Sequence, residues 1–553
     1  EALVAAGVGD IRAAQNLVPS ARFQMQNSST EIYIRGVGST LDLPNIEPPT
    51  VFNFSGIYIP REGTSAGLFD IASIEVLPGP QGTLYGRAAL GGTVNVGFNR
   101  PARDTATAVL LEAGEYSLGR ASVAQNLPVG RRGALRAAAD YIRHEGYQAT
   151  GADSKDDYGL RLSGLHEGER FGAYAWVQGT RKHGRSPNLV RRGYNGGRFD
   201  GDPDAFEGRD PWDDRITATE PDAGRQQYEN LVAGAEFEWR LGAATLTWLP
   251  SYFTLDWAGN YWLENLPSFL SARYDQVTQE LRLAGPGDGR LSWLAGLYAY
   301  RVTNDGEFVV AGFPLADVDH NRLEGLAAFG EATVAVGGRW RLTAGGRLSR
   351  DERQGRGATA FGEPYAVRQD FDELDWKLGA EFDAAPEVML YATVQTGYQP
   401  GTYTLFPPTP QRSNEVREAG LTAWSVGAKS RFLDGRLQLN TELFFYDYRD
   451  LLVQSFNLNT ALLTTFNADR VETWGNQLDL LWQAGEHGRL KLSVGWLRAR
   501  DERFVVPDDI DIGPGRRDFA GEPLQNAPDW TVSAGYQHDF PLAAGYLRAR
   551  VES

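Results

Sequence analysis

The sequence of 553 residues predicts an all-β, transmembrane antiparallel barrel that follows a small N-terminal α+β domain. Three observations predict this fold class. Hydrophobic residues make up 42% of the chain, yet no run approaches the roughly 18–20 apolar residues of a membrane-spanning helix. From about residue 105 onward, strand-length segments alternate between apolar and polar residues. The links between these segments alternate between long and short, which is typical of outer-membrane barrels.

The first domain, residues 1–103, combines one helix with short strands. Residues 2–18 form the predicted helix, and Pro19 ends it. Turn-rich segments separate the predicted strands, which cover residues 32–34, 51–59, 73–77 and 93–98.

The second domain, residues 104–553, is a run of predicted strands of some 9–14 residues with one apolar and one polar face. Residues 437–446 show this most clearly, because the odd positions are mostly apolar and the even positions Gln438, Asn440 and Glu442 are polar. A charge on the lipid face near the membrane midplane costs about 2–4 kcal/mol, so the alternation indicates which face meets lipid.

The connections support the same fold. Short, turn-like links are predicted near 128–133, 241–242, 285–289, 337–338, 384–386 and 433–435. Long polar links are predicted near 182–228, 255–276, 303–322, 350–371, 398–420, 449–470 and 500–529. The count is about 19 strands. Single-chain bacterial barrels close on an even number, so we expect a piece of a longer protein with about three strands missing.

Three motifs in the first domain are specific. They read YIRGVG at 33–38, FDIASIEVLPGPQGTLYGR at 69–87 and AALGGTVNV at 88–96. These motifs resemble the plug domain of TonB-dependent outer-membrane receptors. WSVGAKSRFLDGRL at 424–437 is similar to a barrel hairpin of the same family, and the resemblance covers essentially the whole chain.

The resemblance implies a barrel of 22 strands with residues 1–103 as a plug inside its lumen. It also implies active import of a scarce ligand across the bacterial outer membrane, with TonB and its inner-membrane energising complex acting from the periplasm. Pro78 stands where the family usually has Arg, and no TonB box precedes the plug in this sequence. We therefore expect the TonB box to be missing along with the last strands.

Polar contacts that can break are expected to hold such a plug in a wet lumen, where each ion pair is weak. The candidates are Arg35 and Arg87 on the plug and Glu112, Glu280 and Glu442 on the wall. For any single pair, two solvated charges are an equally good interpretation.

Ligand contacts are expected at the outer rim of the plug and at nearby aromatic residues, because rings bind planar ligands by stacking. The candidates are Asn45, Arg61, Tyr261, Trp262, Tyr398, Tyr403 and Phe406. A place in the interfacial aromatic girdle is the alternative for each ring. Asp200, Asp202 and Asp204 are weak calcium candidates, and a solvated acidic loop is the favoured interpretation there.

By resemblance, the default cargo is a ferric siderophore. Import of a carbohydrate or an aromatic compound, a non-transporting receptor or adhesin barrel, and a secreted carbohydrate hydrolase are the alternatives. We predict no enzymatic activity and no cofactor, since no catalytic motif stands out and the six His residues are scattered. The expected partners are TonB, the ligand and outer-membrane lipid, whereas the net charge of −17 argues against nucleic acid.

Overall fold

The structure is a computed structural model of the chain. It describes residues 11, 15, 18, 20–26, 29–38, 43–146, 151–185, 194–195, 198–199, 224–263, 266–287, 289–310, 312–359, 362–405, 415–457, 462–506, 517–543 and 545–552.

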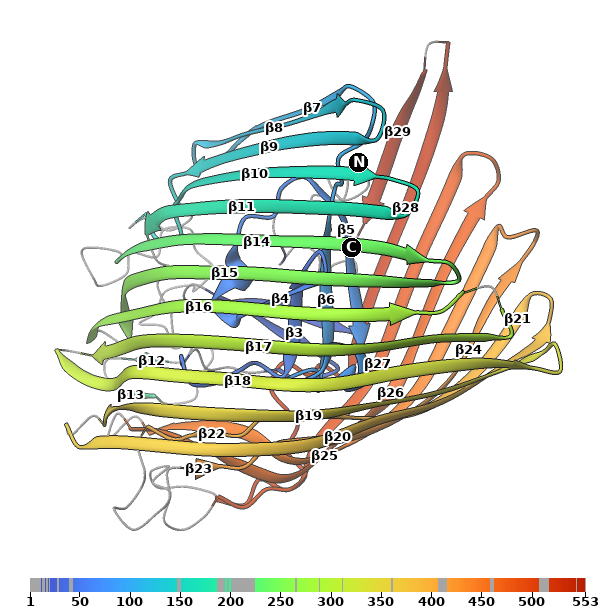
Figure 1. Ribbon diagram of the computed structural model, residues 1–553. Coiled ribbons are helices and arrows are strands. Elements are labelled where there is room, and N and C mark those ends of the chain that lie inside the picture. Colours follow the sequence, from blue (N-terminus) through green and yellow to red (C-terminus); the bar gives the residue numbers. More distant parts are fainter. Residues whose placement is uncertain are drawn as a thin grey trace.

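Within these residues, one antiparallel barrel of 19 strands dominates the structure, which confirms the predicted fold class and strand count (Figure 1). Its strands are β7 (Ala106–Gly114), β8 (Leu118–Val129), β9 (Gly133–His144), β10 (Lys155–Glu167), β11 (Phe171–Arg185), β14 (Arg225–Leu241), β15 (Ala244–Leu263), β16 (Leu266–Ala284), β17 (Leu291–Val310), β18 (Phe313–Val336), β19 (Trp340–Thr359), β20 (Pro364–Ala385), β21 (Val388–Gln399), β24 (Ala419–Phe432), β25 (Leu437–Asn457), β26 (Leu462–Ala484), β27 (Gly488–Arg503), β28 (Trp530–Leu542) and β29 (Gly545–Glu552). Two short hairpins lie outside the barrel, β12 (Tyr194–Asn195) with β13 (Arg198–Phe199) and β22 (Thr402–Tyr403) with β23 (Glu415–Val416).

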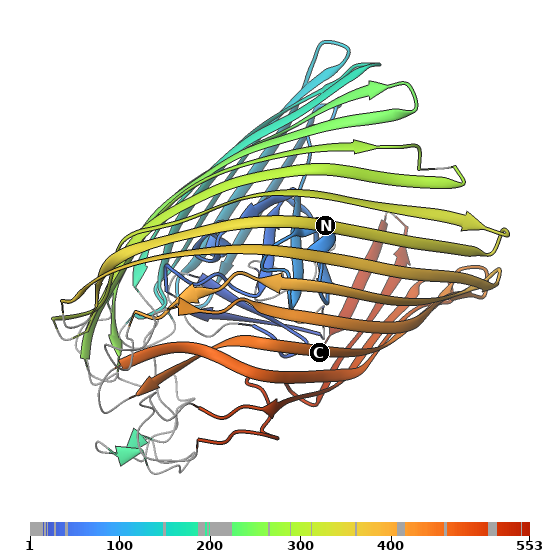
Figure 2. The same cartoon turned by 60° about the horizontal axis from the view of Figure 1, so that its bottom comes forward.

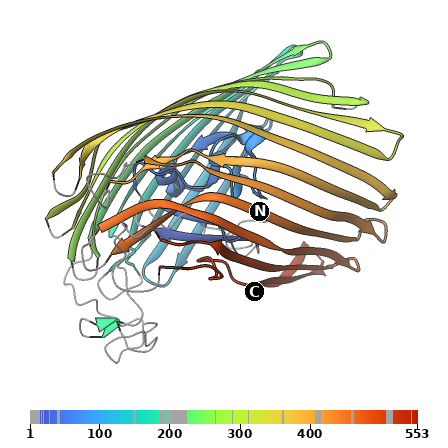
Figure 3. The ribbon, with the colours of Figure 1, turned by 90° about the horizontal axis from the view of Figure 1, so that it is seen from below.

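The first domain lies inside the barrel, and we call it the plug (Figures 2 and 3). Its elements are β1 (Ala21–Gln26), β2 (Ser29–Ile34), β3 (Thr50–Phe54), β4 (Ile57–Ile59), η2 (Arg61–Ser65), β5 (Ile71–Pro78), α2 (Gly82–Tyr85) and β6 (Gly92–Phe98). Four of its strands form one sheet in the order β4-β3-β6-β5, and β1 pairs with β2. The predicted strands at 32–34, 73–77 and 93–98 are confirmed, whereas the predicted strand at 51–59 is a hairpin of two strands, β3 and β4. The predicted helix over 2–18 lies almost entirely outside the described residues.

The barrel strands have two chemically different faces, as their alternation predicted. Leu326 on β18 and Leu348 on β19 are 68% and 62% exposed on the outer face. Their neighbours on the inner face, such as Arg347 and Asp351, are buried against the plug. Soluble proteins rarely expose an apolar band of this extent, so the outer face is the lipid face. No helix in the described part of the chain is long and apolar enough to cross a membrane.

Four of the segments that were predicted as long loops are mainly strands. Residues 255–276, 303–322, 350–371 and 449–470 lie mainly in β15–β16, β17–β18, β19–β20 and β25–β26, which extend almost to tight hairpins. As a result β18 has 24 residues, far more than the roughly 9–11 that cross a bilayer. Cross-strand pairing supplies the hydrogen bonds of these polar segments, so they stay regular beyond the membrane.

The plug packs on the long-loop half of the wall. Phe52, Phe54 and Ile59 of its sheet belong to the same buried cluster as Phe253 and Trp257 of β15. This apolar contact fixes one side of the plug, and polar groups hold the remainder.

Candidate functional site at the plug–wall interface

Arg35 connects the plug to β25. It follows β2, is 3% exposed, and forms an ion pair with Glu442 and a hydrogen bond to the Tyr446 hydroxyl. Its guanidinium also lies 3.7 Å from the centre of the Phe444 ring. Tyr391 of β21 donates to the other oxygen of Glu442 at 2.7 Å. One plug cation therefore contacts three groups of β25, and Tyr391 holds one of them, Glu442, from the neighbouring side.

A loop between β2 and β3 makes the second contact. The Asn45 carbonyl accepts hydrogen bonds from Arg353 Nη1 of β19 and from Thr402 Oγ1, both at 2.6 Å. The Asn45 side chain donates to the Tyr403 carbonyl at 2.7 Å. Glu47 pairs with Arg87 of the plug and lies 3.6 Å from Arg353. The loop is thus tied to β19 of the wall and to the β22–β23 hairpin.

Asp70 makes the third contact, immediately before β5. Its carboxylate accepts two hydrogen bonds from Arg136 of β9, at 2.5 and 2.7 Å, and one from Asn99 at 2.8 Å. Arg161 of β10 donates to the Asp70 carbonyl at 2.6 Å. Burial alone would raise the pKa of the Asp70 carboxyl, but the hydrogen bonds from Arg136 and Asn99 and the charge of Arg161 hold it below its ordinary value.

The helix α2 contacts β18, β19, β20 and β21 at close range. A Cβ atom on Gly82 would lie 2.5 Å from a carboxylate oxygen of Asp375 on β20. Glycine at this position lets the helix backbone approach the wall closely, and any larger residue would require the Asp375 carboxylate to move.

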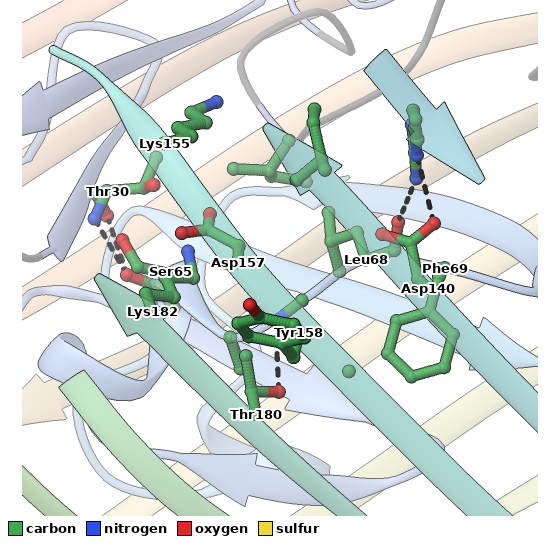
Figure 4. A pocket seen from close by; sticks show the side chains of 17 residues that line it. Thr30, Ser65, Leu68, Phe69, Asp140, Lys155, Asp157, Tyr158, Thr180 and Lys182 are labelled. Carbon is green, nitrogen blue, oxygen red and sulfur yellow. Dashed lines mark hydrogen bonds and ion pairs between the residues drawn. The ribbon is translucent and has the colours of Figure 1, made fainter. Parts of the chain in front are cut away.

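A cavity of about 80 Å³ separates the plug from β9, β10 and β11 (Figure 4). Plug residues 64–69 line one side, and Lys155, Asp157, Thr180 and Lys182 line the other. Thr180 accepts a hydrogen bond from the Gly67 backbone at 3.4 Å. A polar cavity needs only about 10–15 Å³ to hold a water, so this part of the interface is loosely packed and has room for water.

The plug–wall candidates from the sequence fall into two groups. Arg35 and Glu442 pair directly, and Arg87 lies 3.8 Å from the Tyr300 ring of the wall while its carboxylate partner, Glu47, is in the plug. The predicted contacts of Glu112 and Glu280 with the plug are wrong. Both residues pair with arginines of the wall, Arg120 and Arg282, because these cations are nearer than any charge of the plug.

The candidate ligand residues are mostly buried, which corrects their assignment to an open vestibule. Asn45 and Arg61 of the plug and Tyr398 and Tyr403 are all 3% exposed or less. Asn45 and Tyr403 face each other across the plug–wall interface. Tyr398 donates to Asp351, and Arg61 lies 3.6 Å from Glu31 of the plug. Tyr261 and Trp262 lie on β15, but their side chains are outside the described part of the chain, as is Phe406.

The calcium candidates Asp200, Asp202 and Asp204 also lie outside the described residues. Within the described ranges, no group of three or more His, Asp or Glu side chains could hold a metal ion.

Sequence reasoning missed the cations on the inner wall and the acids that they hold. Arg353, Arg161 and Arg136 bind the plug through Glu47 and Asp70 and through carbonyl groups. Alternation could have placed Arg136 and Arg161 on an inner face, whereas Arg353 lies within residues 350–371, which were predicted as a long loop. Only inward carboxylates were considered as wall partners, so the opposite polarity was overlooked.

Comparison with known proteins agrees with this architecture. The profile of the TonB-dependent receptor plug domain matches residues 1–93, and that of the TonB-dependent receptor-like β-barrel matches residues 166–551. The pesticin receptor of Yersinia pestis is 25% identical over 479 residues, which span 82% of this chain and 66% of that receptor.

Solved structures share the fold. The ferric yersiniabactin uptake receptor FyuA from Yersinia pestis has a TM-score of 0.80 at 18% identity, covering 100% of this chain and 84% of that one. The siderophore receptor PiuA from Acinetobacter baumannii has a TM-score of 0.76 at 15% identity, covering 95% and 81%. With both the plug and most of the barrel matched, the chain belongs to the TonB-dependent receptor family of bacterial outer-membrane barrels.

Proposed function

We propose that this protein imports a ferric siderophore across the outer membrane, driven by TonB. The observation that carries the proposal is a plug held in the lumen by separate polar contacts, among them those at Arg35, at Asn45 with Glu47, and at Asp70. A filled lumen passes no large ligand unless the plug rearranges.

Polar anchoring suits a plug that moves. Water can replace each hydrogen bond when the plug shifts, so an individual contact costs only about 0.5–1.5 kcal/mol net to break, and about 1.5–3 kcal/mol where a charge takes part. The cavity beside Gly67 leaves room for water close to the contact at Asp70. Force applied by TonB from the periplasm would break such contacts one after another.

The cargo follows from the relatives. FyuA is a ferric yersiniabactin uptake receptor, and PiuA is a siderophore receptor. The same fold carries other cargoes in principle, so cargo identity has to be measured.

The test is uptake by a strain that lacks the gene, complemented with the full-length gene or with an empty vector. Radioactive iron is supplied on hydroxamate, catecholate and phenolate siderophores, and labelled oligosaccharides are supplied in parallel. We expect gene-dependent iron uptake with at least one siderophore and loss of that uptake in a TonB-deficient strain. Uptake of oligosaccharide alone would show that the cargo is a carbohydrate instead of a siderophore. Gene-dependent binding without uptake would favour a non-transporting receptor.

A further inference from the structure

Two buried side chains of opposite charge face the plug from neighbouring strands of the wall and do not pair with each other. Arg347 of β19 and Asp375 of β20 are directly opposite in the register of these two antiparallel strands (Figure 1). They are 4% and 3% exposed. Side chains in such positions have Cβ atoms about 4.5–5.5 Å apart, which is close enough for an ion pair. Within the part of the chain that the structure describes, however, neither one takes part in an ion pair.

The same two strands provide a comparison. Arg341 and Glu381 are also directly opposite each other, and they form an ion pair at 2.6 Å. Register alone therefore permits pairing between β19 and β20, so another feature has to explain why Arg347 and Asp375 remain apart.

That feature is α2, which packs against both strands. Its two flanking glycines lie against the two charged groups. A Cβ atom on Gly82 would lie 2.5 Å from an Asp375 carboxylate oxygen, and one on Gly86 would lie 2.6 Å from Nη2 of Arg347. The docked helix thus occupies the space beside both groups, and each charge is turned toward a different end of it.

The docked helix also leaves both groups short of hydrogen bonds. Asp375 accepts one from Thr396 Oγ1 at 3.1 Å, and its other carboxylate oxygen is buried without a hydrogen-bond partner. Arg347 donates from Nε to Ser349 Oγ at 3.1 Å, and its guanidinium lies 5.2 Å from the centre of the Phe329 ring. A carboxylate offers about four acceptor sites and a guanidinium five donors, so most of this capacity is unused among the described residues. Buried charges with unmade hydrogen bonds are unfavourable.

We propose that Arg347 and Asp375 form an ion pair when α2 withdraws from the wall, and that this pair stabilises the open state of the plug. Each group then gains the partner that it lacks while α2 is docked. Strand register already brings the two residues together, so rotation of their side chains is sufficient. The proposal rests on the proposed import cycle only in requiring that this part of the plug leaves the wall.

Hydrogen–deuterium exchange of the α2 amides in the purified full-length receptor measures how often this helix leaves the wall. We expect Asp375→Asn and Arg347→Gln each to slow this exchange by about two- to fivefold, the contribution of an opposite-charge pair across neighbouring strands. The double variant should exchange no more slowly than either single variant, because losing one partner already abolishes the pair. Arg347→Lys keeps the cation, so its exchange should be closer to that of the wild type than the exchange of Arg347→Gln.

Glu381→Gln is the matched control. It removes an inward carboxylate of β20 that is already paired with an arginine of β19 while α2 is docked, so the exchange of α2 should not change. Heat-modifiable mobility in gels shows whether each variant has assembled its barrel, and either single variant alone is sufficient to test the direction of the effect.

Three results would overturn the proposal. Faster exchange in the single variants would show that the two charges hold the docked helix, and unchanged exchange would show that they do not influence it. Additive slowing in the double variant would show that the two groups act separately. The measurement needs neither cargo nor TonB, so its outcome is distinguishable from a failure of the proposed transport function, which the uptake assay tests.

Discussion

Arg35 of the plug and Glu442 of β25 form an ion pair across 407 positions of the chain. The same guanidinium contacts Tyr446 and Phe444, so it bridges the plug to one strand through a charge, a hydroxyl and a ring. Such a contact has a consequence for stability, because Glu442 would lose its only plug partner among the described residues if Arg35 were truncated.

We predict that Arg35→Ala lowers the free energy of plug opening by about 2–3 kcal/mol, since it leaves a partly buried carboxylate unpaired. The free energy of plug opening in Arg35→Lys should lie between those of the wild type and Arg35→Ala, because lysine keeps the charge but cannot reproduce the planar fork of the guanidinium. Hydrogen–deuterium exchange of the plug amides in intact receptor measures this energy directly.

The matched control is Arg132→Ala, which removes an arginine from an exposed pair with Glu169. Pairs of this kind contribute about 0–1 kcal/mol, so plug exchange should remain near that of the wild type. If plug amides exchange at the same rate in the Arg35→Ala receptor as in the wild type, the plug does not depend on the Arg35–Glu442 contact.

Acid should weaken the contact at Asp70. The pKa of this carboxyl is lowered in the folded protein, so the native state favours the ionised form. Its contribution to stability is complete above the ordinary carboxyl pKa of about 3.9 and is lost as pH falls through the lower, folded value. We expect wild-type plug exchange to accelerate in this acid range.

Asp70→Asn separates this carboxyl from the other acids. Asp70 has a φ of +50°, a conformation that asparagine also tolerates, so the backbone should be retained. The variant should already be weaker at pH 7, and its difference from the wild type should shrink as pH falls below about 3.9. A difference that stays constant from pH 7 to pH 2 would contradict the role assigned to the ionised carboxylate.

The sequence predicted the architecture well because alternation is a local signal that one face of every strand must obey. It placed Glu442 on an inner face and Arg35 at the end of a plug strand, and the structure brings the two together. Alternation cannot say which inward charge meets which plug residue, since that depends on how the plug is rotated in the lumen. Glu112 and Glu280 show this, because both face wall arginines instead.

The sequence also could not predict that the expected ligand residues are buried. Tyr398 and Tyr403 look like vestibule rings in a sequence, and only the position of the loop containing Asn45 shows that the plug covers them. Strand length was misjudged for a related reason. Polar segments such as 303–322 resemble loops, and only their pairing with a neighbouring strand reveals a hairpin.

Gly92 should be intolerant of any side chain. Its φ is +143°, and a Cβ atom there would collide with the backbone carbonyl of Leu77. Gly56 has a φ of +85° but nothing within 4 Å of the same atom, so Gly56→Ala isolates the backbone cost of about 1–2 kcal/mol. We predict that Gly92→Ala destabilises the plug by about 1–3 kcal/mol more, measured by the same amide exchange. Equal effects of the two substitutions would mean that the collision is relieved without cost.

A disulfide across the cavity beside Gly67 should stop transport reversibly. The chain contains no cysteine, so Gly67→Cys with Thr180→Cys introduces the only pair. These positions face each other between the plug and β11, where a Cβ atom on Gly67 would lie 3.6 Å from Thr180 Cγ2. If the plug separates from β11 during import, the oxidised receptor should bind ligand but take up almost none, and reduction should restore uptake. Each single cysteine variant controls for the substitutions themselves. Unchanged uptake by fully oxidised receptor would mean that the plug segment around Gly67 stays against the wall, and that the path for the ligand opens elsewhere along the plug.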